Sequence, residues 1–337
     1  MRSPLPSHFP TTSVLLSLLL ACTQTTHASP PIEAPLNIAQ SVAARQKLKL
    51  RPLPEDTAEP AVPEIFRDET KDLGPQFIMA PVRRSSLFEA VADVQYFHTS
   101  NALLSENARR ETNILFSTAS FAFTPAPIAF GDTSLELRAG LREQLYNYSL
   151  SSTENQLNNL DFAVSTLFLG GSYQLPNHWS ASLGIDYNRY LSAENRFTEF
   201  YTEALPQWAL AKVIEINERN FITLSYVGAW HLTSTDPNPS PNINDRTDSV
   251  LLLASAHQLS DNLVLQPFYR IQHSHYWKNS DRNDLYNTLG LSLSFILNDW
   301  SSIRAFSTYE TRDSSDPLIP DYRKCDTGLG LSVAIKF

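Results

Sequence analysis

Large apolar residues alternate with small or polar ones from residue 87 to the last residue of the chain. In the final stretch, GLGLSVAIKF, Leu329, Leu331, Val333, Ile335 and Phe337 fall on one face and Gly, Ser, Ala and Lys on the other. A period of two residues indicates a β-strand with one apolar face. Twelve such segments predict an all-β fold; they run approximately over 87–98, 113–123, 134–148, 157–173, 179–190, 207–216, 221–232, 248–258, 263–274, 285–297, 301–311 and 327–337.

The connections between these segments alternate in length. Residues 174–178, 217–220, 259–262 and 298–301 form short connections, whereas 149–156, 191–206, 233–247 and 312–326 are longer and polar. Transmembrane barrels have short periplasmic turns at one end and longer loops at the other. In a bilayer every backbone polar group must be paired, so the sheet has to close on itself.

The tryptophans agree with that arrangement, because Trp179 and Trp300 flank short turns while Trp208, Trp230 and Trp277 lie near the longer connections. These are the positions at which aromatic side chains meet lipid headgroups. The sequence therefore predicts a transmembrane antiparallel up-and-down β-barrel of about twelve strands over residues 87–337, with the last strand paired to the first.

The segment before the barrel has a different composition. Residues 1–28 contain the apolar run TTSVLLSLLLA and predict a signal peptide, with cleavage before Cys22 as the alternative that would give a lipoprotein. Residues 29–86 are rich in proline and charge, which predicts a largely disordered periplasmic tether.

The end of the chain carries a family resemblance. Phe337, with Ile335 and Val333 upstream, resembles the C-terminal assembly signature of Gram-negative outer-membrane β-barrel proteins. The run HTSNALLSENARRETNILFSTASFAF is similar to the first hairpin of a broad porin-like barrel group. The resemblance implies an outer-membrane location, contact with outer-membrane lipid, and recognition of the last strand by the barrel-assembly machinery.

The face opposite the apolar one is expected to line the barrel interior and carries charges of both signs: Glu89, Asp93, Glu136, Arg138, Arg142, Asp186, Arg270, Arg304 and Glu310. Such charges either line a water-filled path or pair with one another. Arg138 and Arg142 could form a track for anionic solutes, or could pair with Glu89, Asp93 or Glu136. The net charge of −9 argues against nucleic acid as a partner.

One motif could carry chemistry. His98 and Ser100 in YFHTSN share the face that is expected to meet lipid. The pattern His-x-Ser-Asn resembles the motif of outer-membrane lipid A 3-O-deacylases and, more loosely, of outer-membrane phospholipase A. That resemblance implies Ser100 as nucleophile, His98 as base, and Glu111 or Asn113 as the group that orients the ring.

No cofactor or metal site is predicted, because His273 and His275 have no third ligand at useful spacing. The function expected from the sequence is a narrow porin-like channel for small hydrophilic solutes, and the chain is not expected to be an enzyme. Two alternatives remain: a lipid esterase that uses Ser100 and His98, and a non-conducting structural or surface-adhesion barrel. The sequence leaves the oligomeric state open.

Overall fold

The structure is a computed structural model that describes residues 86–106, 109–130, 133–148, 161–192, 198–217, 219–235, 244–278, 281–317 and 319–337. The predicted signal peptide and nearly all of the predicted tether lie outside these residues. Among the described residues, no helix is long and apolar enough to cross a membrane.

The described part of the chain consists of strands joined by connections. They are β1 (Phe88–Thr99), β2 (Thr112–Phe123), β3 (Ile128–Phe130), β4 (Thr133–Asn147), β5 (Phe162–Leu175), β6 (Trp179–Ser192), β7 (Thr198–Asn217), β8 (Asn220–Thr235), β9 (Arg246–Ser260), β10 (Leu263–Tyr276), β11 (Arg282–Asn298), β12 (Ser301–Ser314) and β13 (Tyr322–Lys336).

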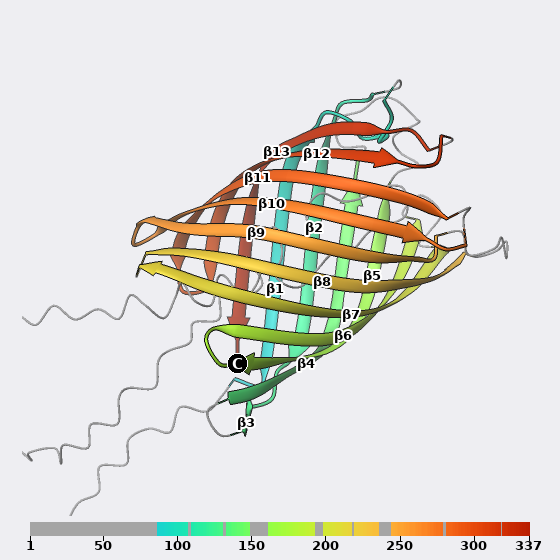
Figure 1. Cartoon of the computed structure of the whole chain (residues 1–337). Coiled ribbons are helices and arrows are strands. Elements are labelled where there is room, and N and C mark those ends of the chain that lie inside the picture. Colours follow the sequence, from blue (N-terminus) through green and yellow to red (C-terminus); the bar gives the residue numbers. More distant parts are fainter. Residues whose placement is uncertain are drawn as a thin grey trace, which may run out of the picture.

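All long strands pair with their neighbours in antiparallel fashion, and β13 pairs with β1, so the sheet closes into a barrel (Figure 1). The short β3 pairs only with β4, within the connection from β2. The wall therefore has twelve strands, which confirms the predicted fold. At the seam, the amide N of Phe337 donates to the carbonyl O of Phe88 at 3.0 Å, and the reciprocal bond is also 3.0 Å. The apolar last strand has no free edge, because its partner is the first strand of the barrel.

Exposure alternates along the strands with a period of two. In β11, the outward Leu285, Leu289 and Leu291 are 40%, 60% and 47% exposed, whereas the inward Tyr286 and Thr288 are nearly buried. The outward face of the wall is mainly apolar, and a water-soluble protein would not leave such a surface uncovered. This is the polarity that a barrel has when lipid surrounds it.

Several predicted boundaries need correction. The segment 191–206 is not a loop, because β6 continues to Ser192 and β7 already begins at Thr198. Trp208 consequently lies in the middle of β7 rather than near a long connection. It pairs with Leu183 and Gly228, and a Cβ atom on Gly228 would lie only 2.5 Å from its indole Nε1.

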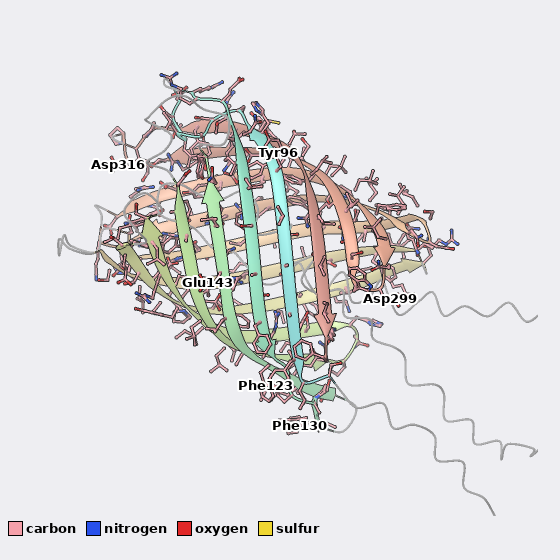
Figure 2. All side chains as sticks on the ribbon, turned by 180° about the vertical axis from the view of Figure 1, so that it is seen from behind. Tyr96, Phe123, Phe130, Glu143, Asp299 and Asp316 are labelled. Atoms are coloured by element: carbon pink, nitrogen blue, oxygen red, sulfur yellow. The ribbon has the colours of Figure 1, made fainter. Side chains whose placement is uncertain are left out.

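The two ends of the barrel differ. At one end of the barrel, where short turns were predicted, the connections are two or three residues long: 176–178, 218–219, 261–262 and 299–300. We call this the short-turn end and the opposite one the long-loop end. Figure 2 shows Phe123 and Phe130 at the former and Asp316, in the β12–β13 connection, at the latter. The ring of Phe88 lies 5.5–6.0 Å from those of Phe121, Phe123 and Phe337, so aromatic contacts reinforce the seam.

Candidate functional site in the barrel interior

The inward side chains toward the long-loop end form a layer that fills the barrel. We call this the closing layer and define it by one residue from each wall strand, none of them more than 4% exposed: Phe97, Phe116, Tyr146, Phe162, Tyr190, Glu203, His231, Asp248, Gln272, Asp284, Glu310 and Lys324. In a barrel with a water-filled passage, the inward side chains would be in contact with water. In the described conformation, water does not reach the inward side chains at this level.

One half of the closing layer is aromatic. The ring centroids of Phe116 and Tyr146 are 4.5 Å apart, and those of Tyr146 and Phe162 are 4.4 Å apart in a stacked arrangement. Tyr190 continues the series at 6.2 Å from Phe162, and Tyr201 of β7 lies 5.0 Å from Tyr190. The chain of rings crosses β2, β4, β5, β6 and β7 in turn. Each ring pair adds about 0.5–1.5 kcal/mol beyond burial of its area, so the series resists separation.

The other half is polar and hydrogen-bonded from strand to strand. The Nδ1 atom of His231 lies 2.5 Å from Oε1 of Glu203, and its Nε2 atom lies 2.9 Å from Oδ2 of Asp248. The Nε2 amide of Gln272 donates to the same Asp248 oxygen at 3.1 Å. Arg246 completes the group with its Nε atom 3.3 Å from Oδ1 of Asp248. Since all of these side chains are buried, each charge depends on its neighbour for compensation.

Further along the same half, Glu310 connects β10, β11, β12 and β13. Its carboxylate accepts hydrogen bonds from the hydroxyls of Tyr322 at 2.8 Å and Thr288 at 3.1 Å. Lys324 Nζ lies 2.9 Å and Arg270 Nη2 lies 3.4 Å from its two oxygens.

The charged residues expected from the sequence all occupy inward positions of their strands. Glu89, Asp93, Asp186, Arg304 and Glu310 are buried, whereas Glu136, Arg138, Arg142 and Arg270 are half-buried.

The two arginines of β4 are both near carboxylates. Arg138 lies 3.6 Å from Glu89, as one interpretation of the sequence expected. Arg142 instead bonds Asp186 on β6 at 3.0 Å. Asp93 lies 3.8 Å from Arg304. Charge pairing therefore dominates over a free arginine track.

The sequence did not identify Glu203, His231, Arg246 and Asp248. Glu203 and Arg246 fell in segments taken for loops, 191–206 and 233–247. His231 and Asp248 lie at the ends of the predicted strands that flank the second of these loops. The signal that could have found Glu203 is the continued alternation of Tyr201, Glu203 and Leu205 upstream of Pro206.

The residues of the esterase alternative lie on the outer face at the long-loop end. Nδ1 of His98 is 3.3 Å from Oδ1 of Asn113, and Nε2 is 3.9 Å from Oε2 of Glu111. Ser100 is turned to another partner, since its Oγ atom accepts a hydrogen bond from the amide N of Cys325 at 2.8 Å. Within the described residues, the structure brings His98 to both orienting candidates but forms no hydrogen bond between His98 and Ser100.

The remaining predicted groups are placed as follows. Ile335 is 51% exposed on the outer face of β13, where Val333 is half-buried, and Phe337, directly after β13, is 60% exposed. The described ranges contain no cluster of three or more His, Cys, Asp and Glu side chains that could hold a metal ion. His275 bonds Asn283 at 3.1 Å.

No family model and no curated protein matches this sequence. Among solved structures, the chain is similar to an outer membrane channel from Pseudomonas putida F1, with a TM-score of 0.52, 10% identity, and coverage of 75% of this chain and 96% of that one. The fold is that of an outer-membrane β-barrel. The β domain of the Bordetella autotransporter BrkA (TM-score 0.43, 12% identity, 73% and 99% coverage) and the NanC porin (0.43, 8%, 72% and 98%) are more distantly similar.

Proposed function

We propose that the protein is a porin-like barrel of the Gram-negative outer membrane whose lumen is closed at rest. Small hydrophilic solutes pass only when the closing layer moves apart. The observation that carries the proposal is the closing layer itself, which buries an inward side chain from every wall strand. On β4, β5 and β6, by contrast, inward residues nearer the short-turn end such as Arg138, Ser172 and Ser182 are half-exposed.

The proposal includes the orientation of the barrel in the outer membrane and its assembly there. The short turns face the periplasm and the long connections face outside, as is usual for such barrels. The outward apolar face contacts lipid, and the barrel-assembly machinery recognises the strand that ends in Val333, Ile335 and Phe337.

Removing rings from the closing layer tests whether it blocks a passage. The double variant Phe162→Ala, Tyr190→Ala deletes two adjacent rings of the aromatic half, and Tyr187→Ala is the matched control. Tyr187 lies on the same strand as Tyr190 but is 48% exposed on the outward face. Wild type and Tyr187→Ala should show little single-channel conductance in a planar bilayer, and the double variant should show clear openings. A folded double variant that conducts no more than wild type would reject the channel and favour the non-conducting structural or adhesion barrel.

A second candidate function is hydrolysis of a lipid ester at His98 and Ser100. The observation that favours it is the position of the His98 ring, held by Asn113 with Glu111 nearby on the outward face. For this chemistry, the Ser100 hydroxyl, which accepts a bond from the Cys325 amide, must also donate its proton to His98.

The esterase candidate is tested with purified protein and phospholipid or lipid A in mixed micelles. Ser100→Ala and His98→Ala should each reduce hydrolysis by about a thousandfold or more if they form a nucleophile and base. Ser307→Ala, another outward serine at the same end, serves as the control and should keep full activity. Wild-type protein that releases no fatty acid would exclude this candidate.

A further inference from the structure

Arg138 holds a guanidinium group with unused donors inside the barrel. Its side chain is 24% exposed, and its nearest carboxylate oxygen, Oε2 of Glu89, lies 3.6 Å from Nη2. That separation exceeds a normal hydrogen bond. The buried Nε has no partner, and the guanidinium donates no hydrogen bond to any residue that the structure describes. The Nε–H is out of reach of a ligand, but the four N–H groups on Nη1 and Nη2 remain to bind an acceptor beside the pair with Glu89.

The position of this guanidinium is fixed by its surroundings. Its carbon lies 5.2 Å from the ring centroid of Phe168, and the guanidinium carbon of Arg142 lies 5.9 Å from the same ring. Phe168 is paired with Gly140 and lies across it, since a Cβ on Gly140 would be 2.7 Å from the ring Cζ. The ring therefore orients Arg138 before any ligand arrives, which lowers the cost of binding.

At the level of Arg138, the next two strands carry glycine on their inward face. Arg138 pairs with Gly170 on β5, which in turn pairs with Gly184 on β6. Both glycines are half-exposed, in contrast to the closing layer. Their inward neighbours toward the short-turn end, Ser172 and Ser182, are also half-exposed and pair with each other. Water therefore reaches this part of the interior, beside a cation and two hydroxyl groups.

The charges nearby limit what kind of anion fits. The positive charges of Arg138 and Arg142 are balanced by Glu89 and Asp186, and Glu136 adds a further carboxylate on the same face of β4. A dianion such as phosphate or sulfate would meet these carboxylates. A single carboxylate matches the planar fork of one arginine and adds one charge only.

We propose that Arg138 binds the carboxylate of a small polyhydroxy acid, with Gly170 and Gly184 beneath the ligand and the hydroxyls of Ser172 and Ser182 facing its hydroxyl groups. The site deepens the proposed channel function, because it lies in the same lumen. It does not require passage, since it lies on the short-turn side of the closing layer.

Titration calorimetry of purified wild-type barrel in detergent tests the site with gluconate as the probe. Sorbitol, in which an alcohol replaces the carboxylate, is the matched ligand control. Gluconate should bind measurably and sorbitol at least tenfold more weakly. Arg138→Gln should weaken gluconate binding at least tenfold. Arg270→Gln is the matched variant control and should retain binding, because Arg270 is an inward arginine that already donates to Glu310.

A second variant tests whether the ligand needs the open space above Gly170 and Gly184, and it leaves the charge of Arg138 unchanged. Gly184→Leu places a side chain over the glycine pair and should also abolish gluconate binding while leaving Arg138 in place. Heat-modifiable gel migration reports whether each variant is a folded barrel. The proposal is overturned if wild type binds no gluconate, if sorbitol or sulfate binds as tightly, or if folded Arg138→Gln or Gly184→Leu binds like wild type. Because the readout is binding, its failure is distinct from a failure of the conductance experiment.

Discussion

The buried ion group around Asp248 gives the sharpest prediction of stability. Asp248 is fully buried and compensates two neighbours, with His231 Nε2 at 2.9 Å and Arg246 Nε at 3.3 Å. Asp248→Asn keeps the shape of the side chain and removes its charge. The guanidinium of Arg246 then loses its nearest carboxylate at a position that water does not reach.

The expected cost follows from that burial. Removing one partner of a buried ion pair typically destabilises a protein by about 3–5 kcal/mol, because the other charge is left uncompensated. Glu203 stays in contact with His231, so part of the group survives and the lower half of that range is expected. The matched control is Glu199→Gln, which removes the same charge from the pair with Arg189 on the outward face, where the side chains are 52% and 29% exposed for Arg189 and Glu199. Such pairs contribute little, so the control should unfold like wild type.

Reversible urea unfolding of the barrel in lipid vesicles, followed by tryptophan fluorescence, measures both variants. Asp248→Asn should shift the midpoint to lower urea with an unchanged slope, and Glu199→Gln should not. Equal midpoints for the two variants would mean that water or rearrangement compensates Arg246. The description of the closing layer as a dry, interlocked group would then be wrong.

Three further predictions concern the wall. Deletion of Phe337 removes its backbone bonds to Phe88 and its ring contacts at the seam, so little heat-modifiable barrel should reach the membrane; normal assembly would contradict the proposed signal. Cys325 is exposed at the long-loop end, so a membrane-impermeant maleimide should label it on whole cells; labelling only after the outer membrane is opened would invert the topology. Gly140→Val would place a Cβ 2.2 Å from the carbonyl O of Phe121, so thermal stability in detergent should fall by several degrees, and an unchanged melting temperature would refute that packing argument.

The wall of the barrel could be predicted from the sequence because each strand carries its own signal. In β11, Leu285, Leu289, Leu291, Leu293 and Phe295 repeat every second residue or every fourth and are all exposed on one face. That local periodicity, together with the need to pair every backbone group in lipid, leaves a closed antiparallel sheet as the solution. The pairing of Phe337 with Phe88 follows from closure and does not depend on side-chain detail.

The start of β7 could not be predicted as readily, because Pro206 and the charged residues before it are typical of a loop, and 191–206 was therefore taken for one. In the structure, Pro206 sits within the strand and pairs with Ile185 of β6. The ladder to β8 is interrupted there, between the Ala204–Leu232 and Gln207–Ala229 pairs. Proline has no N–H to donate, so it is accommodated where that donor is not needed. Proline usually disfavours the interior of a strand, but here the pairing with β6 and β8 on either side of Pro206 keeps the segment in the sheet.

The interior depends on information that no single strand contains. Which inward residues meet is set by the stagger of twelve strands and by the side-chain conformations that fill the lumen. Arg142 illustrates the point, because its partner is Asp186 on β6 and not Glu89, Asp93 or Glu136, the partners that the sequence suggested. The sequence shows inward charges, but it does not show whether they face water or one another.

The relative position of the closing layer and Arg138 makes binding and passage separable events. Arg138 precedes Arg142 and Tyr146 along β4 and therefore lies nearer the short-turn end than the closing layer does. A solute entering from that end would meet Arg138 and the glycine pair first and the aromatic rings afterwards. If the ligand only binds, Arg138→Gln weakens binding in a barrel that stays closed. If the bound ligand is also the permeant solute, the Phe162→Ala, Tyr190→Ala barrel should pass gluconate faster than sorbitol in a liposome-swelling assay, and adding Arg138→Gln should remove that preference. Equal rates for the two solutes in the opened barrel would leave Arg138 as a binding residue with no part in selecting what passes.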